Sequence, residues 1–210
     1  MYSLIEQPWI QVLTTGGESQ TCGLRELFRR ADQVREIVGD LPTQGFAVLR
    51  LALAVVARAY SGPDEVSQWH RLWEREAPET EPVDAYLDEY AERFELFHPQ
   101  TPFFQTAGLR TAKGEFSGLE KLIADVPAGH QYFTTRAGRG LKRISAAEAA
   151  RWLVHLQAFD ISGIKSGAVG DPRVKGGKGY PIGTGFAGHL GGLYVDGGNL
   201  WRTLLLNTIP

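Results

Sequence analysis

The alternation of apolar and polar positions predicts one short strand and then helices. Residues 9–13 (WIQVL) are apolar and β-prone, and the turn-forming residues 14–17 (TTGG) predict that this strand enters a hairpin. Apolar residues recur at helical spacing over 24–37 with Gly39 just beyond, which predicts an amphipathic helix. The stretch 42–60 is hydrophobic nearly all round, as in a centrally buried helix.

Three more helices are expected, over 64–75, 83–96 and 145–159. Ser145 followed by Glu148 forms a capping box that predicts where the last of them begins. Between the second and third, two prolines and a cluster of phenylalanines predict a packed, irregular turn.

The final third has a different pattern. Residues 163–198 contain 13 glycines in 36 positions, which predicts a long, partly mobile loop. Residues 200–209 (LWRTLLLNTI) resemble a buried strand, and because nothing follows it we expect the chain to be a fragment. The predicted fold class is α+β, a single mixed domain over 1–210 with helices concentrated in the first half and short strands.

Composition argues against a membrane or secreted protein. The longest apolar run, 51–57, lies between two arginines and is far shorter than the roughly 20 residues of a membrane span. The first residues lack the basic segment and cleavage site of a secretory signal. The single cysteine, Cys22, cannot form an internal disulfide. We therefore expect a cytoplasmic protein.

The net charge of −2 is unevenly distributed along the chain. Residues 1–130 contain 12 Lys and Arg against 20 Asp and Glu, whereas residues 131–210 contain 10 against 4. The basic final segment suggests contact with a polyanion, and the alternative is a basic surface that only aids solubility.

Catalytic chemistry finds little support. Residues 183–188 match the glycine pattern of nucleotide-binding loops, which leaves a phosphate- or nucleotide-binding enzyme as the alternative function. The surroundings of that motif do not read as strand, turn and helix. The five histidines are scattered singly without metal-binding spacing. We predict no enzyme activity, no cofactor and no metal.

The basic segment 132–143 (YFTTRAGRGLKR) and the glycine-rich loop after it suit nucleic acid better. Cations neutralise phosphates, and aromatic side chains can stack on bases. The alternative is a surface excursion whose aromatic residues are tucked into the core. The predicted phosphate contacts are Arg136, Arg139, Lys142, Arg143, Lys175 and Lys178.

Four stretches, in order along the chain, resemble the CasA (Cse-family) large subunit of the type I-E CRISPR Cascade complex. They are residues 4–10 (LIEQPWI), 39–51 (GDLPTQGFAVLRL), 94–105 with its FELFHP and PFFQ segments, and 202–207 (RTLLLN). The last resembles the family's strand after its glycine-rich region. Together they span nearly the whole chain, and the combination is more specific than any single motif.

This resemblance implies a non-catalytic subunit that binds the other Cascade subunits, guide RNA and double-stranded target DNA. It implies that the subunit helps to recognise the short motif beside the target (the PAM) and recruits the helicase-nuclease in antiviral defence. A C-terminal four-helix bundle would normally follow and is missing. The family's lysine finger and glutamine wedge would lie beyond Pro210, so we expect weak DNA binding.

The resemblance also assigns sites. Tyr132, Phe133, Thr134 and Thr135 match the loop that anchors the subunit near the 5′ end of the guide. Gly183, Thr184 and Gly185 match the glycine loop that touches the PAM from the minor groove, where sequence readout is degenerate.

Overall fold

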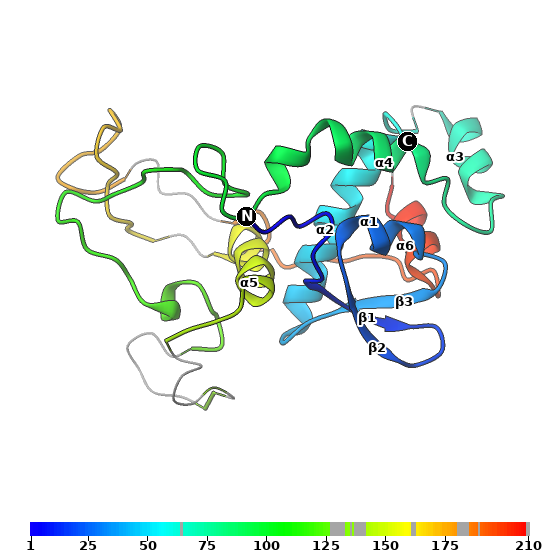
Figure 1. Cartoon of the computed structure of the whole chain (residues 1–210), viewed down its shortest axis with the longest axis horizontal. Coiled ribbons are helices and arrows are strands. Elements are labelled where there is room, and N and C mark those ends of the chain that lie inside the picture. The colour runs from blue at the N-terminus through cyan, green and yellow to red at the C-terminus, as the bar shows by residue number, and fades with distance from the viewer. Residues whose placement is uncertain are drawn as a thin grey trace.

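The computed structural model describes residues 1–63, 65–126, 133–134, 136, 142–160, 163–179, 185–188 and 190–208. It shows an α+β fold in which one small antiparallel sheet packs against helices (Figure 1). The strands are β1 (Ile10–Thr14), β2 (Ser19–Cys22) and β3 (Val34–Val38), in the order β2-β1-β3. The predicted strand and hairpin at 9–17 are confirmed by β1 and β2.

The helices are α1 (Leu24–Arg29), α2 (Pro42–Ala59), α3 (Val66–Trp73), α4 (Glu81–Glu89), α5 (Ala146–Phe159) and α6 (Leu200–Leu206), with 3₁₀ turns at Ala91–Phe94 and Leu119–Lys121. The predictions for α2, α3 and α5 are confirmed to within a few residues at each end. The helix predicted over 83–96 is two elements, because the chain leaves α4 at Tyr90 and continues as the 3₁₀ turn.

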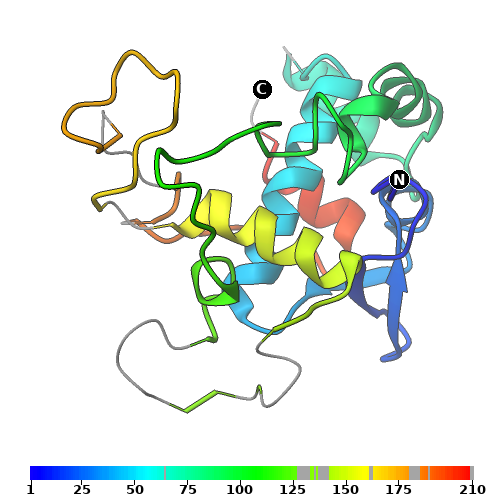
Figure 2. The same ribbon diagram turned by 60° about the vertical axis from the view of Figure 1, so that its left-hand side comes forward.

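Helix α2 is the centre of the main core. It lies against β3, α4, α5 and α6, and α5 crosses it (Figures 1 and 2). Its buried residues include Ala47, Val48, Leu49, Leu53 and Val56, which lie on several sides of the helix. Burial on several sides explains why its sequence is apolar nearly all round.

The helix predicted over 24–37 is wrong beyond Arg29. The segment 34–38 is strand β3, and its pairing with β1 satisfies backbone groups that a helix would satisfy internally. Val34 and Ile37 have helical i, i+3 spacing, but both are β-branched, as is Val38, and β-branched residues favour a pleated strand. The helical periodicity therefore mixed residues from two different elements.

The strand predicted over 200–209 is also wrong, since residues 200–206 form α6. Asn199 caps this helix, and its side-chain oxygen accepts a hydrogen bond from the Arg202 amide at 2.8 Å. Leucine has good helix propensity, so the cap and burial against α2 and α3 decide the conformation.

The described residues of the glycine-rich stretch form no helix and no extended strand. Single bridges join Thr111 to Ala168 and Ser166 to Lys178. The segments 107–118 and 163–179 therefore lie together, on the side of α5 away from the sheet (Figure 1).

We expect Gly45→Ala to destabilise the fold. A Cβ at Gly45 would lie 2.7 Å from the backbone oxygen of Ile37, so α2 and β3 would have to separate. Overpacking of this kind costs about 1–3 kcal/mol. The gain in helix propensity recovers at most about 1 kcal/mol.

Urea unfolding measures the change in the free energy of unfolding. Gly16→Ala is the matched control, because its Cβ would lie 3.7 Å from the Thr14 hydroxyl, an ordinary contact. Equal stability of the two variants would contradict the close approach of α2 to β3.

Candidate nucleic-acid and assembly interface

Phe133 is the exposed aromatic residue of the predicted anchoring loop. Its side chain is fully exposed, while Tyr132 and Thr135 lie outside the described residues. The hydroxyl of the next residue, Thr134, donates a hydrogen bond to Asp125 Oδ2 at 3.1 Å and accepts one from the Arg136 amide at 3.2 Å. An exposed aromatic side chain is thus followed directly by a residue whose hydroxyl forms two hydrogen bonds.

Arg136 ties this loop to three separate segments. Its guanidinium pairs with Asp40 Oδ2 at 3.1 Å, with Asp125 Oδ2 at 3.9 Å and with Glu148 Oε1. Asp40 lies in the β3–α2 turn, Asp125 follows the second 3₁₀ turn, and Glu148 lies in the first turn of α5. We call Arg136 with these three carboxylates the arginine clamp.

The clamp lies on a buried aromatic ring. The guanidinium carbon of Arg136 is 5.6 Å from the ring centroid of Trp152, whose side chain is fully buried. Trp152 forms a second small core with Ile123 and Val126. Because only 12% of the Arg136 side chain is exposed, its geometry supports a positioning role in place of the phosphate contact predicted from sequence.

A line of rings leads from the clamp along α5 to α2. Trp152 contacts His155, His155 stacks on Phe159 at 5.1 Å between centroids, and Phe159 meets Phe46 at 6.0 Å. His155 Nε2 lies 3.0 Å from the Thr43 hydroxyl. Burial lowers the pKa of His155, so the neutral imidazole is favoured in this site.

Gly185 docks on the C-terminal end of α5. Its amide donates to the Asp160 carbonyl at 2.6 Å, and the Ala187 amide donates to the Ala158 carbonyl at 2.7 Å. A Cβ on Gly185 would lie 2.6 Å from the Ala158 carbonyl group. Gly183 and Thr184 lie outside the described residues.

This docking bears on the nucleotide-binding alternative. A phosphate loop needs free amides at the start of a helix, where the dipole favours an anion. Here the amides of Gly185 and Ala187 are engaged, and they lie at the end of a helix, where the dipole is negative. The described part of the motif therefore lacks the geometry of a phosphate site.

Four of the predicted basic residues remain available to a polyanion. The side chains of Lys142, Arg143, Lys175 and Lys178 are exposed, and within the described ranges none of them forms an ion pair. Lys175 and Lys178 bracket a tight turn through mutual backbone hydrogen bonds of 3.0 and 3.1 Å. Arg139 lies outside the described residues.

In the part of the chain that the structure describes, we find no reactive cysteine, metal site or membrane-spanning helix. Cys22 is buried, and burial together with nearby Glu26 raises its pKa to about 12, far from a reactive thiolate. In those same ranges no three His, Cys, Asp or Glu side chains gather as metal ligands would. None of the helices described there has the length and apolar character needed to cross a bilayer.

The sequence and the fold both match one known family. The family model for CRISPR-associated protein Cse1 matches residues 3–210. The chain belongs to the Cse1 (CasA) family. It is 33% identical over 219 residues to a CRISPR-associated protein CasA/Cse1 of Thermus thermophilus, an alignment that covers all of this chain and 40% of that protein.

Solved structures agree with this Cse1-family assignment. The crystal structure of Thermobifida fusca Cse1 is similar with a TM-score of 0.89 and 51% identity, covering 99% of this chain and 39% of that one. A chain of a CRISPR RNA-guided surveillance complex shares the fold with a TM-score of 0.80 at 24% identity, covering 98% and 43%. This chain thus spans about two fifths of the length of its Cse1 relatives.

Sequence reasoning predicted an anchoring loop at 132–135 but missed the residues that contact this segment in the structure. Asp40 and Asp125 carried no signal, because they match no motif and lie among many other acidic residues, and Asp40 is also distant in sequence from Arg136. Glu148 was predicted only as part of the capping box. In the structure Ser145 accepts from the Glu148 amide at 3.2 Å, and the Glu148 carboxylate pairs with Arg136.

We expect Arg136→Gln to loosen the loop while leaving the fold intact. Each hydrogen bond to a charged group contributes about 1.5–3 kcal/mol, so the local opening free energy should fall and exchange of the amide of residue 136, which donates to the Thr134 hydroxyl, should accelerate at least about tenfold. Hydrogen exchange measures this rate. Arg143→Gln removes an exposed arginine nearby and should exchange like the wild type; equal acceleration in both variants would count against the clamp.

We expect His155 to make stability depend on pH. Because its pKa is lowered in the folded state from 6.5, protonation favours unfolding, and its contribution is complete above about pH 6.5 and lost as pH falls below that value. Between pH 7 and pH 5, the free energy of unfolding measured in urea should fall less for His155→Gln than for the wild type. His70→Gln, at an exposed site, should follow the wild type.

Proposed function

We propose that this chain is the N-terminal part of the non-catalytic large subunit of a type I-E CRISPR surveillance complex. Its family membership supports the proposal, as does the shared fold with a chain of an RNA-guided surveillance complex. The chain joins the other subunits and the guide RNA, and the complete protein binds target DNA beside the PAM.

Phe133 is the observation that carries this proposal. A fully exposed phenylalanine is unfavourable in water unless a partner covers it, and an aromatic ring at an interface is a common binding hot spot. The arginine clamp holds the adjacent backbone, so little conformational entropy is lost when the ring binds. Phe133, with Tyr132, Thr134 and Thr135, anchors the subunit near the 5′ end of the guide RNA.

DNA contact falls to the basic residues and the glycine loop. Lys142, Arg143, Lys175 and Lys178 present charges that can neutralise phosphates. Gly183, Thr184 and Gly185 form the loop on the PAM side. Because the Gly185 amide is hydrogen-bonded to the end of α5, Gly185 attaches the loop to the helix. Direct contact with DNA is then made by Gly183 and Thr184.

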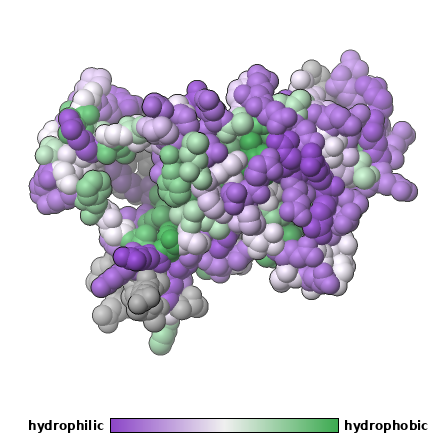
Figure 3. Space-filling model, in the orientation of Figure 1, coloured by the Kyte–Doolittle hydropathy of each residue, from purple (hydrophilic) through white to green (hydrophobic). Residues whose placement is uncertain are grey.

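Recruitment of the helicase-nuclease belongs to the whole subunit. The described surface over α3 and α4 is strongly hydrophilic (Figure 3), and residues 66–89, which contain both helices, carry 2 Arg against 7 Asp and Glu. An acidic surface repels nucleic acid and leaves this end of the domain facing protein partners.

We expect Phe133→Ala to weaken binding to a guide-RNA-bound complex that lacks its large subunit. Loss of a central aromatic contact costs about 2 kcal/mol or more, which corresponds to a Kd at least about 30-fold higher. Co-elution and titration measure the effect. Thermal stability should not change, because the ring makes no contribution to the core.

Phe116→Ala is the matched control, since Phe116 is also a highly exposed phenylalanine on another loop. It should bind like the wild type. If both variants bound like the wild type, the anchoring role of Phe133 would be wrong; if both were equally weakened, the contact would be a general apolar one.

A further inference from the structure

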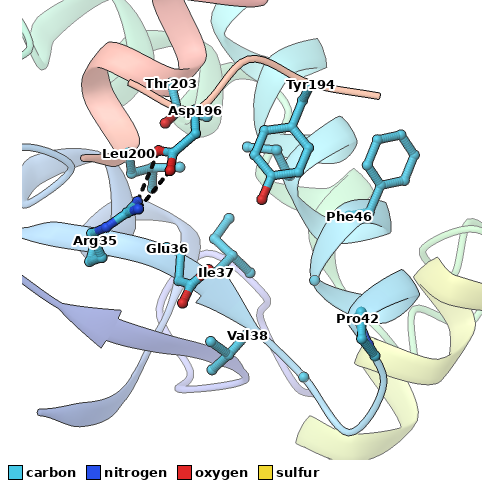
Figure 4. A pocket seen from close by; sticks show the side chains of 13 residues that line it. Arg35, Glu36, Ile37, Val38, Pro42, Phe46, Tyr194, Asp196, Leu200 and Thr203 are labelled. Atoms are coloured by element: carbon cyan, nitrogen blue, oxygen red, sulfur yellow. Dashed lines mark hydrogen bonds and ion pairs between the residues drawn. The ribbon is translucent and has the colours of Figure 1, made fainter. Parts of the chain in front are cut away.

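A pocket of about 300 Å³ lies between β3, the start of α2, the segment 194–196 and α6 (Figure 4). Its size is at the lower end of ligand-binding cavities and suits one or two large side chains. It is distinct from the Phe133 loop and from the glycine loop.

The free edge of β3 forms one side of this pocket. Five consecutive residues, 35–39, line it, and since alternate residues of a strand point to opposite faces, a continuous run shows that the pocket follows the strand edge. The strand is an edge strand, because the order of the sheet is β2-β1-β3. Edge strands present backbone groups that can pair with another chain.

Ile37 directs its backbone toward the pocket side. Its carbonyl oxygen lies 2.7 Å from where a Cβ of Gly45 would be, so that carbonyl points away from β1 and toward α2. In an antiparallel pair the amide and carbonyl of one residue point to the same side. The Ile37 amide is therefore a backbone donor directed out of the sheet.

A β-bulge in β3 positions Arg35, one of the charged residues at the rim of the pocket. Leu13 pairs with Glu36 and Thr14 with Val34, so Arg35 has no partner on β1. Bulges redirect side chains, and here Arg35 reaches Asp196 through two hydrogen bonds of 2.9 and 2.6 Å, which close one end of the pocket (Figure 4).

The walls of the pocket combine apolar surface with a net negative charge. Phe46 and Tyr194 face the pocket with ring centroids 6.4 Å apart, and the Tyr194 side chain is 46% exposed. Arg35 and Asp196 neutralise one another, whereas Glu36 has no ion-pair partner in the part of the chain that is described. The apolar surface continues outward through Leu193 and Val195, which are exposed.

We propose that this pocket binds a short segment of a partner protein that inserts a large aliphatic side chain next to a basic residue. The aliphatic group packs against the ring of Tyr194, in the space between that ring and β3, and a backbone carbonyl of the segment accepts from the Ile37 amide. The basic residue pairs with Glu36. The charge of the rim and the continuing apolar surface favour a basic, apolar peptide over an anionic metabolite.

The test uses the whole chain and three tetrapeptides blocked at both ends. The probe is serine-leucine-arginine-serine; the controls replace leucine by serine, or arginine by glutamate. Amide NMR spectra report binding at Ile37, Gly39 and Tyr194. We expect saturable chemical-shift changes at these residues with the probe and none with the serine control. The glutamate control should bind about threefold more weakly than the probe.

Variants assign the effect to the pocket. Tyr194→Ala should abolish the chemical-shift changes without changing the Tm of the protein. Glu36→Gln should remove the preference for the arginine peptide over the glutamate peptide. Glu18→Gln, at the opposite edge of the sheet, should bind as the wild type does. Absence of saturable shifts, equal binding of the serine control, or shifts that persist in Tyr194→Ala would each overturn the proposal.

Discussion

The close packing of α2 against the edge of β3 is the constraint on which the other features depend. Gly45 lets the helix approach the Ile37 carbonyl, where any larger residue would collide with backbone. From that position α2 also contacts α4, α5 and α6. Its first turns carry Thr43, which binds His155, and Phe46, which meets Phe159. A shift of α2 would therefore move both the support of the Phe133 loop and one wall of the pocket.

The molecule separates rigid support from exposed contact groups. The arginine clamp and the buried ring of Trp152 lie at the base of the loop, and Phe133 projects fully into solvent. At the other end of the line of rings, Phe46 and Tyr194 flank a pocket whose rim is set by the bulged Arg35. In both places a charged residue with fixed partners orients the backbone beside an accessible aromatic group, an arrangement that lowers the entropy lost on binding.

Much of the fold could be predicted from local patterns, and the errors have a common cause. The strand before the TTGG turn, the buried helix α2 and the capped helix α5 each have a signal within the element itself: a turn, hydrophobicity on all sides, or a side-chain cap. The segments 34–38 and 200–206 do not. Val34 and Ile37 have helical spacing but β-branched side chains, and the leucines of α6 fit two conformations. Their pairing with β1 and their packing on α2 and α3 decided the outcome.

The candidate site divides in the same way. Sequence by itself determined the family, the α+β class and the aromatic and basic character of 132–143, because these are properties of residue types in order along the chain. Only the tertiary structure decided that Arg136 is a clamp, that the Gly185 amide is engaged, and that Arg35, Phe46 and Tyr194 share a pocket. These depend on pairs up to about 160 positions apart, such as Arg35 with Asp196. Folding brings such residues together through the packing of entire elements, and no local pattern encodes that distance.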